Sequence, residues 1–180
     1  MPNWCYTSYR FNGDEENLYK LNEDIDKLSE DNKTLFVVDI IDSLKLKVPD
    51  GANLRGHIIY NDVGMIETES AWNPCEDFIN ALCDKYDLTY LYFAEEPGCI
   101  GYWSNDIDNE VFDTKYIVYD CESEEEQRFG GPVSDEELKK GILEWLNLGR
   151  ESRCQSKFKT FEEASGDDNV SITEVEYTTE

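Results

Sequence analysis

The chain has 180 residues, of which 41 are Asp or Glu and 16 are Lys or Arg, so its formal net charge is −25 at pH 7. This charge disfavours direct binding to a nucleic-acid backbone or to an anionic membrane, because both are negatively charged, and it favours a basic partner. The hydrophobic share of 39% and the aromatic share of 13% argue against general disorder.

The first third of the chain predicts a strand followed by an amphipathic helix. Side chains alternate over residues 3–11, as they do in a strand, with aromatic residues on both faces. Asn12-Gly13 predicts a turn, and Asp14 can cap a following helix. That helix has an apolar face with three- and four-residue spacing, formed by Leu18, Leu21, Ile25 and Leu28.

Three further strands are predicted before residue 61. The run 35–41 is dense in apolar and β-branched residues and predicts a strand, although Asp39 interrupts it. Apolar residues and lysines alternate over residues 44–48, which favours a second short strand. Residues 56–60 are a third strand candidate, separated from the second by a loop.

A strand, a helix and a hairpin follow one another in the centre of the chain. Residues 65–71 alternate, and Asn73-Pro74 is typical of a helix start, because Asn can cap a helix and Pro suits its first turn. Residues 88–94 predict a buried strand, residues 95–98 a turn and residues 99–104 a return strand. The helix between them has one apolar face, formed by Phe78, Ile79, Leu82 and Tyr86.

Acidic and polar segments separate the remaining predicted elements. Residues 110–121 predict another strand, and residues 122–127 predict a solvated acidic turn. Ser134 and Glu137 match a capping box, which indicates the start of a helix. Alternating apolar residues over 170–177 favour late strands.

Three short motifs stand in order over about residues 1–120: the opening Met1–Cys5, the junction Glu67–Pro74 and the hairpin Glu95–Gly101. Together they resemble a family carried on phages and plasmids, the Api-like phage proteins with a YubB-type ferredoxin-like domain. The resemblance implies an α+β sheet with two helices on one face, and it implies no particular reaction. Residues 34–60 and the acidic region after residue 121 do not match the family pattern.

The order strand, helix, strands, helix, strands agrees with this resemblance, because an α+β sandwich needs that order. We therefore predict an α+β fold with a ferredoxin-like antiparallel sheet and two helices on one face. The ferredoxin-like domain is predicted to span residues 1–121. Residues 122–180 are predicted to form an acidic C-terminal helix and strand extension packed on the same domain.

The cysteines and the single histidine give little support for a metal site, because no two of the six cysteines form a C-x-x-C pair. We predict neither a metal nor another cofactor. The start of the chain carries no apolar leader, and no apolar run approaches the ~18 residues of a membrane-spanning helix. The host cytosol is therefore the predicted location.

Acidic residues in the second half of the chain are the main candidates for partner binding. Asp106, Asp108 and Glu110 alternate, and in an extended chain they would share one face at intervals of about 7 Å. Such a row could imitate the phosphates of a nucleic-acid strand. The alternative is a solvated segment with surplus acid. The residues predicted to bind a basic partner are Glu95, Glu96, Asp106, Asp108, Glu110, Asp113, Glu122, Glu124, Glu125 and Glu126.

Three tryptophans, Trp4, Trp72 and Trp103, are candidates for an aromatic binding surface. For Trp4 and Trp72 we favour the alternative of packing in or beside the core, since aromatic side chains dominate core burial. His57 could serve as a general base, but a lone histidine outside a catalytic motif is more often a surface or strand residue.

We expect a non-enzymatic protein of a mobile element that binds and inhibits a basic, nucleic-acid-handling host protein. An anti-CRISPR or other anti-defence inhibitor that acts partly as a nucleic-acid mimic fits this description, and its partner could be a CRISPR effector or another defence nuclease. One alternative is a small-molecule or nucleotide-handling enzyme with a pocket near Trp4, Trp72 and His57. Another is a structural or accessory module that forms oligomers through an aromatic sheet face.

Overall fold

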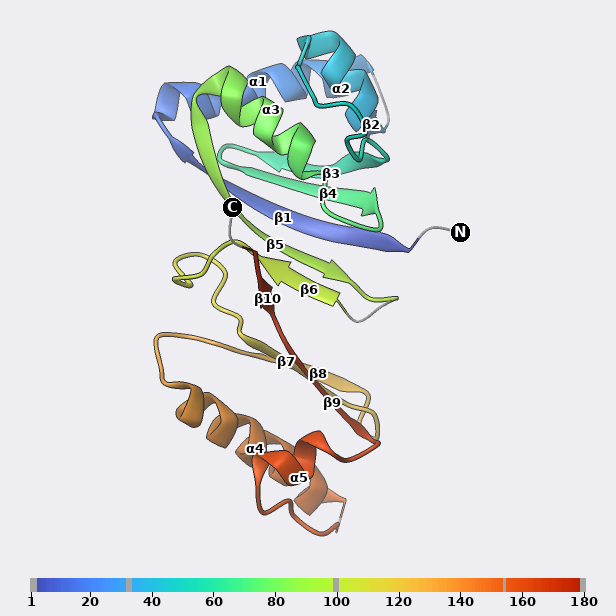
Figure 1. The fold of residues 1–180 in the computed structure, drawn as a ribbon, viewed down its shortest axis with the longest axis vertical. Helices are drawn as coiled ribbons and strands as arrows, with labels where there is room; N and C mark the ends of the chain where they lie inside the picture. Colours follow the sequence, from blue (N-terminus) through green and yellow to red (C-terminus); the bar gives the residue numbers. More distant parts are fainter. Residues whose placement is uncertain (1–2, 32–33, 99–100, 154, 179–180) are drawn as a thin grey trace. The chain divides into compact units, whose positions relative to one another are not determined.

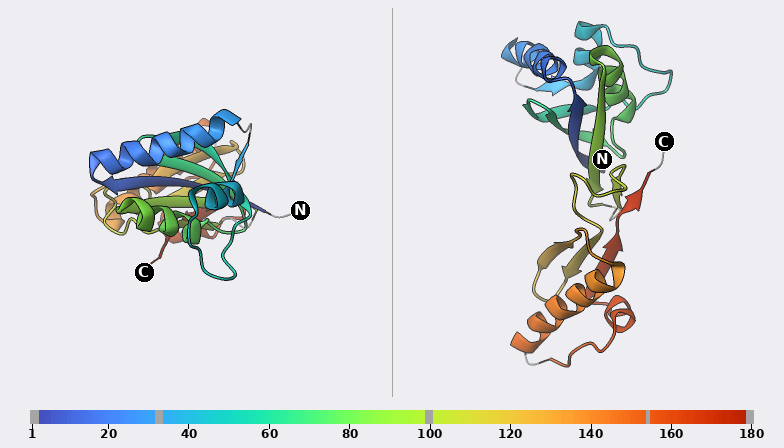
Figure 2. Two further views of the ribbon diagram at one scale, coloured as in Figure 1. Left: turned by 90° about the horizontal axis from the view of Figure 1, so that it is seen from above. Right: turned by 90° about the vertical axis from the view of Figure 1, so that its left-hand side faces the viewer.

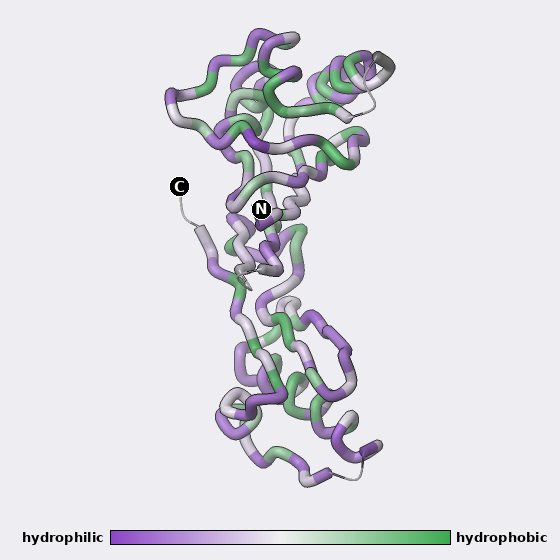
Figure 3. The backbone as a smooth tube through the Cα atoms, turned by 90° about the vertical axis from the view of Figure 1, so that its right-hand side faces the viewer, coloured by the Kyte–Doolittle hydropathy of each residue, from purple (hydrophilic) through white to green (hydrophobic). Residues whose placement is uncertain are grey.

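The computed structural model describes residues 3–31, 34–98, 101–153 and 155–178, which form two compact units (Figure 1). Unit 1 contains residues 1–106 and 177–180, and unit 2 contains residues 107–176. Residue 121, which the sequence suggested as a domain boundary, therefore lies inside unit 2. Hydrophilic and hydrophobic residues alternate along the elements of both units, as amphipathic strands and helices require (Figure 3).

Unit 1 is built on a mixed α+β arrangement with an antiparallel sheet. The strands of this sheet are β1 (Trp4–Gly13), β2 (Leu35–Phe36), β3 (Gly56–Asp62), β4 (Met65–Ala71), β5 (Leu88–Glu96), β6 (Gly101–Ser104) and β10 (Glu176–Tyr177). Their order is β10-β6-β5-β1-β4-β3-β2. The central strand β1 pairs antiparallel with both β4 and β5, and β4 pairs antiparallel with β3. The α+β class predicted from the sequence is confirmed.

Three helices cover one face of this sheet (Figures 1 and 2). They are α1 (Glu15–Asp31), α2 (Val37–Leu44) and α3 (Glu76–Tyr86). The alternation of β1 turns Cys5, Tyr9 and Phe11 toward the helices, where they are buried with Ile25 and Ile79. Because side chains alternate along a strand, the residues between them point to the opposite face.

The segment 37–48 differs from its sequence prediction. Strand β2 has only two residues, and the apolar run continues as helix α2. Val37, Ile40 and Ile41 are buried at helical spacing, whereas Asp39 is exposed, so the acids that interrupt the run mark the outer face of a helix. The predicted strand over 44–48 is also wrong, because Lys45 ends the helix with a positive φ of 52° and the chain continues without regular structure.

The helix predicted to open at Asn73-Pro74 begins later. Helix α3 starts at Glu76 with Cys75 as its N-cap residue. Asn73 belongs instead to a turn, in which its carbonyl oxygen accepts a hydrogen bond of 2.7 Å from the Ser70 hydroxyl. The return strand predicted over 99–104 is confirmed as β6 from Gly101 onward, and residues 99–100 lie outside the described residues.

Unit 2 combines a second antiparallel sheet with two helices. The elements are β7 (Tyr116–Asp120), β8 (Glu125–Phe129), α4 (Asp135–Ser152), α5 (Phe161–Ser165) and β9 (Val170–Glu174). The strand order is β8-β7-β9, and both pairings are antiparallel. Tyr116, Val118 and Ile142 belong to its buried core. The capping box is confirmed, because Ser134 and Glu137 exchange backbone and side-chain hydrogen bonds of 3.0 and 3.3 Å.

The acidic turn predicted over 122–127 ends earlier than expected. The turn covers residues 121–124, and Glu125 and Glu126 already belong to β8, where they lie opposite Asp120 and Tyr119. Strand pairing with β7 therefore outweighs the low β-propensity of this acidic run. The strand predicted over 110–121 is shorter, because only residues 116–120 form β7.

Candidate binding surface

The acidic residues of unit 1 that were predicted to bind a partner are all at least partly buried, but to different degrees. Glu96 is 2% exposed and Asp106 is 1% exposed, so neither offers its charge to a partner. The Glu96 carboxylate instead accepts a hydrogen bond of 2.9 Å from the backbone N–H of Gly98, in the turn after β5. Glu95 is half-buried and lies opposite Tyr6 of β1.

The predicted row Asp106, Asp108 and Glu110 does not form. Residues 105–110 contain turns and bends but no strand, and Asn109 has a positive φ of 52°, so the chain is not extended there. Asp108, Glu110 and Asp113 are exposed in the irregular segment before β7. The prediction that these three carboxylates share one strand face is wrong. Binding of a basic partner by the exposed acids stays a prediction.

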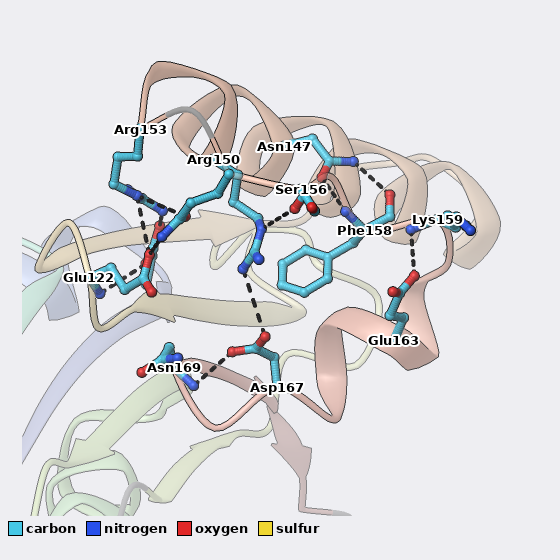
Figure 4. Close-up of polar contacts among 12 residues, drawn as sticks. Glu122, Asn147, Arg150, Arg153, Ser156, Phe158, Lys159, Glu163, Asp167 and Asn169 are labelled. Carbon is cyan, nitrogen blue, oxygen red and sulfur yellow. Dashed lines mark hydrogen bonds and ion pairs between the residues drawn. The ribbon is translucent and has the colours of Figure 1, made fainter.

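Part of the predicted acidic segment 122–126 is neutralised inside unit 2 (Figure 4). The Nε atom of Arg153 lies 3.3 Å from Oε2 of Glu122, and Nη2 of Arg153 lies 2.7 Å from Oδ2 of Asp120. Burial is the largest single influence on the pKa of Asp120 and acts to raise it. The hydrogen bonds from Arg153 and from the Glu122 N–H, together with the Arg153 charge, nevertheless hold that pKa below its ordinary value. Glu126 pairs with Arg128 at 3.3 Å.

Glu124 and Glu125 are exposed and form no ion pair among the residues that the structure describes. Glu124 has a positive φ of 57° in the turn before β8, so it does not continue a strand face with its neighbours. The carboxylates of this segment therefore do not repeat the spacing of a phosphate strand.

The opposite face of the unit 1 sheet carries a different kind of surface. No helix among the described residues of unit 1 packs on this face, where Trp4 and Tyr6 of β1 are 41% and 40% exposed. The register places Tyr6 opposite Glu69 of β4 and Glu95 of β5. Because directly opposite residues share a face, both carboxylates lie on the same side of the sheet as the two aromatic rings.

Glu69 is the centre of this surface. It hydrogen-bonds the Tyr6 hydroxyl, and this contact together with the charge of Glu69 raises the pKa of Tyr6. On its other side, Oε2 of Glu69 lies 3.3 Å from Nε2 of His57. The His57 ring meets the rings of Trp4 and Phe36 edge-on, with centroids 6.3 and 6.0 Å apart. We call these five residues the aromatic–acid surface.

A row of polar side chains continues along the same face. Nη1 of Arg10 donates a hydrogen bond of 2.9 Å to the Ser8 hydroxyl, which lies 3.4 Å from Oε1 of Glu67. Ser8 thus lies between a basic and an acidic side chain on this face. Glu69 and Glu95 lie opposite Tyr6, nearer the other end of β1.

The three candidate tryptophans separate into two groups. Trp4 and Trp72 are among the exposed large hydrophobic residues, so neither is packed in the core. Trp103 lies opposite Ala94, a buried residue on the helix-covered side, and it packs against the core. Trp103 is therefore not on the same face as Trp4.

Other site types find little support in the described residues. They contain no group of three or more His, Cys, Asp and Glu side chains that could hold a metal ion. A hollow of about 300 Å³ in unit 1 is lined by Leu46, Lys47 and Lys85, among others, and not by the tryptophans named for the enzyme alternative. No helix in the described parts of the chain is long and apolar enough to cross a membrane.

Sequence reasoning named Trp4 and His57 but missed Tyr6, Phe36 and Glu69 as members of one site. The alternation of β1 carried the signal for Tyr6, since it places Tyr6 on the same face as Trp4. The position of Phe36 depends on the pairing of β2 with β3, which sequence alone does not specify. The sequence matches no protein-family model, and no curated protein or solved structure matches it either.

Proposed function

We propose that this chain is a non-enzymatic binding protein whose aromatic–acid surface captures a positively charged segment of a partner protein. The observation that carries the proposal is the arrangement of the half-exposed rings of Trp4 and Tyr6 beside the Glu69 carboxylate. A lysine or arginine side chain can pair with such a carboxylate while its alkyl stem and charge lie against the rings. Each cation–π contact at an exposed site contributes about 0.5–1 kcal/mol.

Net charge supports the same kind of partner. Unit 1 contains 22 acidic and 8 basic residues, and unit 2 contains 19 acidic and 8 basic residues. This excess speeds the encounter with a basic protein and repels nucleic acids directly. The local geometry then selects where the basic segment binds, because the long-range field alone has no such specificity.

The fold proposal follows from the strand order. Strands β5-β1-β4-β3 are neighbours in the sheet, α1 follows β1, and α3 follows β4, which is the order of a ferredoxin-like β-α-β-β-α-β unit. Strand β2 and helix α2 are then an insertion within it. We propose on this basis, and on the three sequence motifs, a relation to the phage- and plasmid-borne family with the YubB-type domain.

A more specific form of the proposal is an inhibitor of a basic, nucleic-acid-handling host protein in the host cytosol. An anti-CRISPR or other anti-defence inhibitor has to occupy a positively charged surface that otherwise binds nucleic acid. The exposed acids Asp108, Glu110, Asp113, Glu124 and Glu125 of unit 2 would add to such an interaction without forming a regular mimic of a strand.

The first experiment measures binding of a fluorescent oligolysine peptide to the full chain and to Glu69→Gln. We expect Glu69→Gln to weaken binding about 3- to 10-fold, because one charge-assisted contact is lost. The matched control is Glu16→Gln on α1, which removes an equal charge from an exposed position of the same unit and should change affinity less than about twofold. Equal effects of the two variants would mean that net charge alone explains peptide binding, and they would contradict the proposed surface.

A further inference from the structure

Trp72 has an unusual backbone conformation for a bulky residue. Its φ is 73°, and the N–H of the next residue donates a hydrogen bond of 3.0 Å to the carbonyl oxygen of the preceding one. A three-residue turn with a positive φ at its centre is rare and strained. Positive φ values are favourable for glycine and are genuine outliers for large side chains.

The surrounding hydrogen bonds keep the turn in place. The N–H of Trp72 donates a hydrogen bond of 2.9 Å to the carbonyl oxygen of Asn3. The Asn53 amide donates hydrogen bonds of 3.0 Å to both carbonyl oxygens that flank Trp72. Ser70 donates a further hydrogen bond to the second of these oxygens. The turn is therefore held by two distant segments of unit 1, which contribute Asn3 and Asn53, and by Ser70 directly beside it.

The strain is not offset by complete burial of the indole, because Trp72 is 49% exposed. It directly follows Ala71, which lies opposite Trp4, so the two exposed tryptophans are at the same end of the β1–β4 pair. Strained, rigidly held residues occur preferentially at ligand-binding positions. A backbone that is already held in one conformation also loses little conformational entropy when a partner binds.

We propose that Trp72 is a preorganised anchor on which an arginine guanidinium of the basic partner stacks. This inference rests on the proposed function and names the side chain that the partner contributes. Trp is the strongest cation–π acceptor, and the planar, weakly hydrated guanidinium stacks on aromatic faces better than an ammonium group does. The occupant is a basic segment and not a second copy of this chain, because two copies that each carry a charge of −25 repel each other.

The strain itself is tested by comparing Trp72→Ala with Trp72→Gly. Both variants remove the same contacts, so the difference between them reports the backbone conformation. Trp72→Gly should melt roughly 2–6 °C above Trp72→Ala, because only glycine accepts the positive φ without strain. At Trp4, in extended β1, the order should reverse, with the alanine variant at least as stable as the glycine variant. If the alanine and glycine variants had the same order of melting temperature at both positions, the proposal that Trp72 is held in a strained conformation would be overturned.

The role in binding is tested with oligoarginine and oligolysine peptides of equal length at the same ionic strength. We expect the full chain to bind oligoarginine several-fold more tightly, and Trp72→Ala and Trp72→Gly to reduce this preference to near unity while oligolysine binding changes little. The control is Tyr19→Ala, which removes an equally exposed ring from α1 and should leave the preference unchanged. An unchanged preference in the Trp72 variants would overturn the anchor role.

The two proposals fail in different ways. If neither peptide distinguishes Glu69→Gln from Glu16→Gln, the proposed function fails. If Glu69 matters but arginine preference does not depend on Trp72, only the anchor fails. Self-association of the full chain that the Trp72 variants abolish, measured by light scattering, would assign Trp72 to a contact between copies and overturn the proposal.

Discussion

Nη2 of Arg153 lies 2.7 Å from Oδ2 of Asp120, a carboxylate that is only 4% exposed. Asp120 ends β7 and Arg153 follows α4, so this pair ties the sheet of unit 2 to its longest helix. The contact also explains why the acidic segment around Asp120 is less available to a partner than its sequence indicates.

Removal of Arg153 should therefore destabilise unit 2. Arg153→Met leaves the buried Asp120 carboxylate without its cationic partner, and we expect a loss of roughly 2–4 kcal/mol in the free energy of unfolding. Urea denaturation at neutral pH measures this loss. The double variant Arg153→Met with Asp120→Asn should recover part of it, since no buried charge remains. A double variant as unstable as the sum of both single ones would contradict this explanation.

The acid stability of unit 2 should depend on Asp135. Hydrogen bonds from Lys115, then Lys139 and Tyr116, hold the pKa of Asp135 well below its ordinary value of 3.8. A carboxyl whose pKa is lower in the folded state contributes stability above its unfolded pKa, and this contribution is lost as pH falls through the folded value. As the pH is lowered from about 7 to about 2, the melting temperature should thus fall less steeply for Asp135→Asn than for the unchanged chain. Parallel pH profiles would show that Asp135 does not carry this effect.

Helix α2 can be checked with two alanine variants in the same segment. Ile40→Ala creates a cavity in the unit 1 core and should cost about 2–5 kcal/mol. Val38 is exposed, and alanine has the higher helix propensity, so Val38→Ala should be neutral or slightly stabilising, by at most about 0.7 kcal/mol. In a strand, the same exposed change from a β-branched residue would be unfavourable. Urea denaturation separates these outcomes.

Thiol reactivity should follow burial. Burial raises the pKa values of Cys5 and Cys75 to about 11, and both side chains are fully buried. Cys121 is exposed. Iodoacetamide at about pH 8 should therefore label Cys121 in the folded chain and reach Cys5 and Cys75 only after denaturant is added, because the thiolate is the reactive form. Mass spectrometry of tryptic peptides measures the labelling, and rapid labelling of Cys5 in the native chain would be inconsistent with this structure.

The sequence predicts elements best where one residue period dominates. The alternation in β1 and the apolar faces of α1 and α3 follow directly from side-chain spacing. The β-branched residues after Leu35 favour a strand, although the spacing of Val37, Ile40 and Ile41 also fits a helix. A short apolar run fits either period, and only its packing against β3 in the folded unit decides between them.

The candidate site depends on pairing between distant segments. Tyr6 and Glu69 meet because β1 aligns with β4 in one particular register, and a shift of one residue would move Glu69 to the opposite face. The positive φ of Trp72 likewise arises from its ties to Asn3 and Asn53. Residue types alone suggested an aromatic surface, but its members follow from the register.

Unit 1 consists of two stretches of sequence, and this makes excision of unit 2 practical. The N–H of Thr178 donates a hydrogen bond of 2.8 Å to the carbonyl oxygen of Ser104, and its hydroxyl lies 2.9 Å from that of Tyr92. A short glycine-serine bridge could therefore replace residues 107–176, whereas simple truncation after residue 106 would strip Tyr92 of this neighbour. Such a minimal protein retains Glu69 and Trp72 but lacks the acids of residues 107–176. Its biological effect therefore shows which of the two sets of carboxylates is required.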